Sequence, residues 1–156
     1  MPRMYSAVFE GVTVSATQDF FEITAPSTGV VRLHEIHITQ DDNETSQQLP
    51  VRILRVPATV TGGSGGSTPT PRKLGGTTDA AAGAVVKVNN TTPATTSGTL
   101  ETLRRQGDNV LNGWHWVFTP ETRIDVPPSG VVVVRLVTAP SAGIPMSGEL
   151  LWEEIG

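Results

Sequence analysis

The 156-residue sequence contains no cysteine. This absence excludes a disulfide framework, a thiolate metal site and a cysteine nucleophile. Aromatic residues are also scarce, and no apolar run approaches the roughly 20 residues that a membrane-spanning helix needs. The N-terminal residues lack the long apolar segment of a signal peptide. We therefore expect neither a leader nor a membrane partner.

Positive charge is in deficit as well. Eleven lysines and arginines stand against 15 aspartates and glutamates, which gives a formal net charge of −4. Proteins that bind nucleic acid usually present a basic face, so this balance argues against a nucleic-acid partner. A chain of this length is expected to form a single domain, residues 1–156, around one core.

Valine, threonine and turn residues are abundant, and short strand-like segments recur between them. Trp114, Trp116 and Phe118 alternate as on a half-buried strand, and residues 131–137 are apolar on both parities, which is typical of a central strand covered on both faces. About eight such strands predict an all-β chain, a β-sandwich or jelly roll. The one exception is residues 99–109, whose leucine spacing predicts a short helix.

Three of the strand segments change parity part-way along. In residues 4–15 the change falls at Gly11, which indicates a bulge or a bend. Residues 30–40 switch near His34, and residues 48–56 switch in the same way. Because side chains alternate with a period of two, each switch requires either a bulge or cover on both faces. We interpret the last two segments as neighbours that bend together.

A stretch rich in Gly, Ser, Thr, Pro and Ala, residues 57–84, interrupts the strands. Its side chains are too small and polar to fill a core, so we expect an extended arm that contacts a neighbouring subunit or another protein. Shortening the arm should then leave the isolated fold intact. The alternative is a surface loop without a role. The residues that we predict to form its partner interface are Val60, Arg72, Lys73 and Leu74.

Candidate catalytic and metal-binding residues are few. His34 and His37 lie three positions apart, so on a regular strand they point to opposite faces and cannot bind one metal ion without a bulge. His115 is interpreted as an outward-facing or subunit-interface residue. Glu149 and Glu153 would lie about 13 Å apart along a strand, farther than the acid–base pair of a glycosidase, and are interpreted as edge-strand charges. We expect no catalysis, no metal and no cofactor.

Three stretches together resemble a family of small structural proteins of tailed bacteriophages. They are DFFEITAPSTGVVRLHEIHITQ, TGGSGGSTPTPRKLGGTTDAAAGAVVKVNNTT and SGELLWEEIG. The family is that of capsid decoration, or cement, proteins, which have a jelly-roll body. The resemblance implies a homotrimer that binds the major capsid protein on the outer surface of an icosahedral virion and stabilises the shell. It brings no catalytic residues.

Two other classes of protein stay open at this point. A carbohydrate-binding β-sandwich of a tail fibre or baseplate would use Trp114, His115, Trp116 and the acidic turn at residues 41–44. A cupin-like metal enzyme would need two histidines on one face of a strand, followed by a glutamate, and the segment HEIHITQDDNE lacks that spacing. Glycan binding would support the first class, and stoichiometric metal would support the second.

Overall fold

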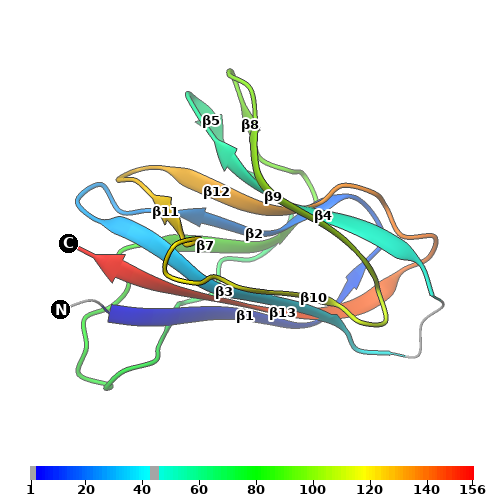
Figure 1. The fold of residues 1–156 in the computed structure, drawn as a ribbon, viewed down its shortest axis with the longest axis horizontal. Coiled ribbons are helices and arrows are strands. Elements are labelled where there is room, and N and C mark those ends of the chain that lie inside the picture. The colour runs from blue at the N-terminus through cyan, green and yellow to red at the C-terminus, as the bar shows by residue number, and fades with distance from the viewer. Residues whose placement is uncertain (1–2, 43–45) are drawn as a thin grey trace.

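The computed structural model describes residues 3–42 and 46–156, and within these ranges it contains thirteen strands and no helix. Two antiparallel sheets pack face to face, and a small two-stranded ribbon stands away from them (Figure 1). The predicted all-β sandwich is confirmed. The number of strands exceeds the expected eight because several short segments also pair with the main strands.

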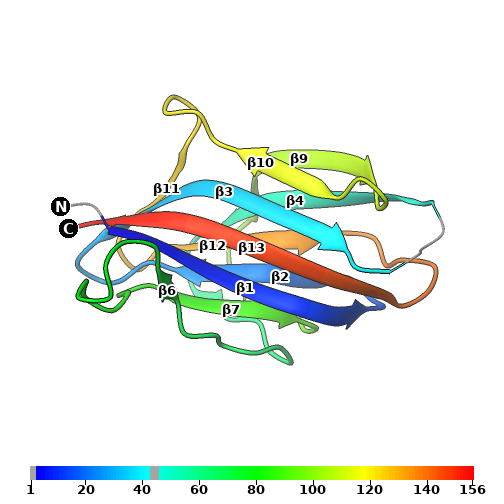
Figure 2. The ribbon, with the colours of Figure 1, turned by 90° about the horizontal axis from the view of Figure 1, so that it is seen from below.

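The first sheet has the strand order β10–β3–β13–β1–β6, and β11 pairs with β3 as well. Its three long strands, β1, β13 and β3, lie side by side along the molecule (Figure 2). The members of this sheet are β1 (Arg3–Val14), β3 (Val30–Gln40), β6 (Arg72–Lys73), β10 (Trp114–Val117), β11 (Ile124–Val126) and β13 (Ile144–Ile155).

The second sheet has the order β7–β2–β12–β4–β9. The strand predicted at residues 131–137 is its central strand, and its four valines are all buried. The members of this sheet are β2 (Gln18–Thr24), β4 (Gln48–Val56), β7 (Val85–Asn90), β9 (Glu101–Asn109) and β12 (Val131–Leu136). The separate ribbon consists of β5 (Val60–Thr61) and β8 (Thr95–Thr96).

The main core fills the space between the two sheets. Phe20 lies at its centre, with ring centroids 6.4 Å from Trp114 and 6.1 Å from Phe9. Each large side chain buried here contributes about 1.5–3 kcal/mol. A second, smaller cluster lies on the outer face of the second sheet, where the chain around the ribbon covers it. Its buried members are Leu54, Val56, Ala94, Val131 and Val133.

Bulges account for two of the three parity switches. Gly11, with a φ of +58°, lies where the register between β1 and β13 shifts. The register between β3 and β13 shifts so that His34 has no residue opposite it. The switch in β4 arises differently, because Leu54 belongs to the outer cluster while Ile53 faces the main core. The interpretation of β3 and β4 as neighbours is wrong, since the two strands lie in different sheets.

The helix predicted at residues 99–109 is also wrong, because most of this segment forms β9 at the edge of the second sheet. In the pairing with β4, Leu103 is the extra residue of a bulge between Thr102 and Arg104. Leu103 packs against the main core and Leu100 against the outer cluster. The leucine spacing therefore serves two faces of a sheet, and strand pairing outweighs a weak helical preference.

The arm lies against its own sandwich rather than leaving it. Ser64 and Ser67 form bridges with Thr92 and Val88, so this part of the arm runs beside β7, and the short strand β6 pairs with β1. These contacts use backbone groups, each of which needs a hydrogen-bond partner whatever side chain it carries. The arm therefore pairs with its own sandwich through its backbone, and contact with a neighbouring subunit or another protein stays a prediction.

Two glycines of the arm allow its close approach to β7. A Cβ atom on Gly66 would lie 2.0 Å from the carbonyl oxygen of Val88. A Cβ atom on Gly63 would lie 2.6 Å from the side-chain nitrogen of Asn90. Glycine is needed at both positions because no larger residue fits between the two backbones.

Replacing Gly66 with alanine should push this part of the arm away from β7. We expect Gly66→Ala to lower the free energy of unfolding by about 1–3 kcal/mol and to speed amide hydrogen exchange at Ser64 and Ser67. Gly76→Ala is the matched control, because a Cβ atom there would lie no closer than 3.5 Å to its nearest neighbour. Equal stability and equal exchange in the two variants would contradict the close packing described here.

Candidate functional site

The four residues predicted as a partner interface lie at two separate places. Val60 is in the ribbon and packs against the outer cluster of the second sheet. Arg72 and Lys73 form β6, and both residues are exposed. Leu74 follows them with 48% of its surface exposed, and its N–H donates to the carbonyl of Met4. The structure therefore keeps Arg72, Lys73 and Leu74 together on one exposed edge and separates Val60 from them.

A buried carboxylate on β2, that of Glu22, holds the beginning of the arm. Only 3% of this residue is exposed. Its Oε2 accepts hydrogen bonds from the Gly63 N–H at 2.7 Å and from the Asn90 amide at 2.9 Å. The ammonium group of Lys87 lies 3.4 Å from Oε1. Burying a carboxylate costs several kcal/mol unless such partners replace the lost water, so these partners fix the arm's position.

Asp19, on the same strand, is completely buried and holds the segment that follows β7. The guanidinium of Arg135 donates to both of its carboxylate oxygens, at 2.5 and 3.1 Å. The backbone N–H of Ala94 donates to Oδ2 at 2.7 Å, and Arg135 donates in turn to the carbonyl of Ala94. This network fastens residue 94 to the outer face of the second sheet.

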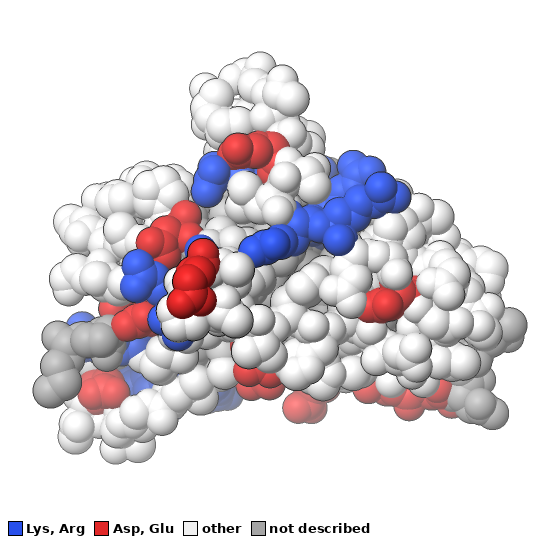
Figure 3. All heavy atoms as spheres, in the orientation of Figure 1, with Lys and Arg blue, Asp and Glu red and all other residues white. Residues whose placement is uncertain are grey.

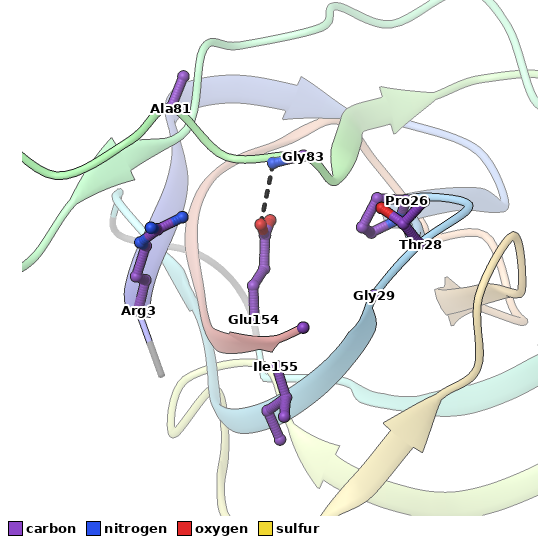
Figure 4. A pocket seen from close by; sticks show the side chains of 9 residues that line it. Arg3, Pro26, Thr28, Gly29, Ala81, Gly83, Glu154 and Ile155 are labelled. Atoms are coloured by element: carbon purple, nitrogen blue, oxygen red, sulfur yellow. Dashed lines mark hydrogen bonds between the residues drawn. The ribbon is translucent and has the colours of Figure 1, made fainter. Parts of the chain in front are cut away.

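A third carboxylate, that of Glu154 on β13, holds the end of the arm. Its side chain points toward Gly83 at the rim of a shallow hollow (Figure 4). The N–H groups of Gly83 and Ala84 donate to its two oxygens, each at 2.9 Å, and the indole N–H of Trp152 lies 3.3 Å from Oε1. The arm is thus held by carboxylates at both ends and by strand pairing at β6.

Sequence reasoning missed these carboxylates. Asp19 and Glu22 lie in the segment DFFEIT, whose apolar residues predicted a strand but whose acidic residues received no role. An acidic side chain inside an otherwise buried strand is itself a signal, because it must find a buried partner.

Tyr5 makes a further contact with the arm. Its hydroxyl donates to the carbonyl of Ala80 at 3.0 Å, and its ring packs 5.9 Å from that of Trp152. Burial raises the pKa of Tyr5, and the nearby Glu154 carboxylate raises it further. Both effects favour the neutral phenol, which is the form that can donate to the arm.

The three histidines lie on the outer face of the first sheet. His34 Nε2 is 3.0 Å from a carboxylate oxygen of Glu153, so the His34 ring has a hydrogen-bond partner within the sheet. The rings of His37 and His115 contact each other with centroids 4.7 Å apart, and His115 Nε2 lies 2.6 Å from Glu35. The prediction that His115 faces outward is confirmed. The described residues contain no group of three or more His, Asp or Glu placed to hold a metal ion.

The interpretation of Glu149 and Glu153 as edge-strand charges is wrong, because β13 lies between β1 and β3.

Within the described part of the chain there is no helix that could span a membrane.

The residues considered for a carbohydrate site do not form one platform. Trp114 is completely buried, and its ring packs against Phe20 in the main core. Trp116 is half-buried on the same face of β10, whereas His115 points to the opposite face. Of the acidic turn, residues 43 and 44 lie outside the described residues. The described residues therefore do not favour a sugar-stacking site on β10.

We expect the hydroxyl of Tyr5 to ionise above the ordinary tyrosine pKa of about 10. Since the folded pKa is raised, the phenol contributes stability below the unfolded pKa, and this contribution is lost as the pH rises through the folded pKa. The chain has one tyrosine, so phenolate absorbance measures the transition directly. The same midpoint in the folded and in the denatured protein would show that Tyr5 is not buried against the arm.

No protein-family model, no curated protein and no solved structure matches the chain in the comparisons with known proteins. The arm, its carboxylate contacts and the exposed faces are therefore the features on which a function can be proposed.

Proposed function

We propose that the chain is a structural virion protein, a decoration subunit that binds the outside of an icosahedral phage capsid and stabilises it as a homotrimer. Two kinds of observation support this proposal. One is the resemblance of three sequence stretches to capsid decoration proteins. The other, which carries most of the proposal, is the order in which the strands pair.

We further propose that the sandwich is a jelly roll. Eight strands support this, because they pair in the orders β10–β3–β13–β1 and β9–β4–β12–β2. In each half, a strand from the end of the chain lies between two from its beginning, as two interleaved Greek keys require. The arm is then an insertion between the fourth and fifth of these strands.

In this proposal the contact with the major capsid protein is made by Arg72, Lys73 and Leu74. The two cations are exposed, and pairing of β6 with β1 holds their backbone in place. A contact that is already ordered loses little entropy when it binds. On a shell that repeats the same contact many times, modest single affinities add up to stable attachment.

The homotrimer rests on the resemblance more than on packing. The apolar outer faces of β4 and β12 are covered by the chain's own ribbon segment. Exposed apolar residues are found instead on the outer face of the first sheet, where Val8 is 41% and Val117 64% exposed. This face is where we place contacts between subunits.

The proposal is tested by sedimenting the purified protein with undecorated shells of the phage that encodes it. We expect the wild-type protein to sediment with the shells, and Arg72→Glu with Lys73→Glu to weaken this at least about tenfold, since each reversed charge faces the shell. Thr68→Glu, an exposed position elsewhere in the arm, should bind like wild type. If the wild-type protein stays in solution at every concentration, or if antibodies label only the tail of virions, the decoration role is wrong.

A further inference from the structure

The two lateral sides of the sandwich differ in how their edge strands end. On one side the arm covers both edges, since β6 pairs with β1 and the bridges of Ser64 and Ser67 lie beside β7. On the other side the edges are β9 and β10, and in the described part of the chain each pairs only with its inner neighbour (Figure 2). Such open rows of N–H and C=O groups are templates for a further strand.

Arginines gather on this open side. Arg104 and Arg105 belong to β9, and Arg52 of β4 lies directly opposite Arg105. The space-filling view shows a band of basic atoms across this side of a protein whose net charge is −4 (Figure 3). Like charges that lie directly opposite each other in an antiparallel pair repel and destabilise the pair. The band therefore carries positive charge that the neighbouring strand does not neutralise.

Other arginines of the chain have carboxylate partners. Arg32 donates twice to Asp125, at 2.7 and 2.9 Å, and these bonds hold the pKa of that carboxyl below its usual value. Arg55 is paired with Glu101 at 2.8 Å. The pairing of Arg135 with Asp19 on β2 has been described above. Arginines on this protein therefore take carboxylates where the fold supplies them.

Arg52, Arg104 and Arg105 form no ion pair with a carboxylate among the described residues, whereas Arg123 acts on the nearby Asp125 and lowers the pKa of that carboxyl. Within the described chain, Arg104 donates to the carbonyl of Thr122 at 3.5 Å. The Nε atoms of Arg52 and of Arg123, which precedes β11, are buried without a hydrogen-bond partner in the described chain. The exposed side chains of Arg104 and Arg105 are the ones that an acceptor on another molecule can reach.

A hollow lies between the two open edges, so it is bounded by both sheets. It joins the guanidinium groups of Arg104 and Arg105 to the apolar surface of Trp116 and Phe118. The residues that line it are Arg104, Arg105, Trp116, Val117, Phe118 and Thr122.

We propose that this open side binds an extended acidic segment of a partner protein, added as a further strand along β9. The backbone of the segment would pair with the free edge of β9, its carboxylates on one face would take up Arg52 and Arg105, and an apolar side chain on the other face would enter the hollow beside Arg104. Strand addition supplies affinity through main-chain hydrogen bonds and specificity through alternate side chains. This surface is separate from β6, and the proposal holds whether or not the chain decorates a capsid.

The acidic segment explains the site better than two other occupants. A nucleic acid would satisfy the arginines but leave the edge of β9 unpaired, and the net charge of −4 would repel it. In a second copy, the half-buried carboxylates of Glu35 and Glu149 lie on central strands whose backbones are already paired on both sides. A second copy cannot present them as an added strand.

Nuclear magnetic resonance titration of the whole protein with a short peptide of alternating glutamate and valine tests the proposal. We expect the amide signals of β9 to shift and their hydrogen exchange to slow. Arg52→Glu with Arg105→Glu should weaken binding at least about tenfold, since these two residues lie opposite each other on one face and both reversed charges would meet the carboxylates. Arg72→Glu with Lys73→Glu makes the same charge change on the covered side and should leave the affinity unchanged.

Further probes separate the two parts of the proposal from its rivals. A peptide with every backbone nitrogen methylated keeps its charge but has no N–H to donate to a strand edge, so undiminished binding would overturn strand addition. Shifts confined to β6, or no shifts at all, would overturn the site. So would binding of oligothymidylate without binding of the peptide, or a dimer in light scattering that Arg105→Glu abolishes.

Discussion

Hydrogen bonds from backbone N–H groups to carboxylates, one buried and one half-buried, hold the arm against this structure outside its main core. Glu22 accepts from Gly63, and Glu154 accepts from Gly83 and Ala84, so the same chemistry fixes the arm where it begins and where it ends. Bonds of this kind to an ionised acceptor are roughly twice as strong as neutral ones. They suit an arm that has few side chains with which to pack.

The path of the arm decides which surfaces the protein leaves open. By lying along β1 and β7, it covers two edges that would otherwise pair with other chains. The same path presents Arg72, Lys73 and Leu74 on an exposed edge. The opposite side keeps the uncovered strands β9 and β10, together with Arg52, Arg104 and Arg105, which have no ion pair with a carboxylate in the described ranges. One covered side and one open side thus follow from a single insertion between β4 and β9.

Much of the fold could be predicted from the sequence, because period-two patterns report directly on sheet faces. The central strand β12 and the irregularity at Gly11 could be predicted from parity, whereas the switches of β3 and β4 look alike in the sequence and only that of β3 is a bulge. The strand β9 could not be predicted from a period-two pattern, because the bulge at Leu103 makes its leucine spacing resemble that of a helix.

The site was harder to predict than the fold. The course of the arm depends on backbone contacts that composition does not encode, and on Glu22 and Glu154, which lie far from the arm in the sequence. Composition shows that the arm cannot form a core of its own. Composition does not show that residues elsewhere in the chain supply the partners that hold the arm in place.

The central claim is that the arm is a fixed part of this fold, held by its backbone. Native-state hydrogen exchange of the isolated protein measures this directly at the amides of Ser64, Ser67 and Leu74, whose hydrogen bonds to Thr92, Val88 and Met4 are 3.0 Å long. We predict slow exchange at all three positions, comparable to that of amides on β12. Exchange at the rate of an unstructured chain would mean that the arm is free in solution and would contradict the account.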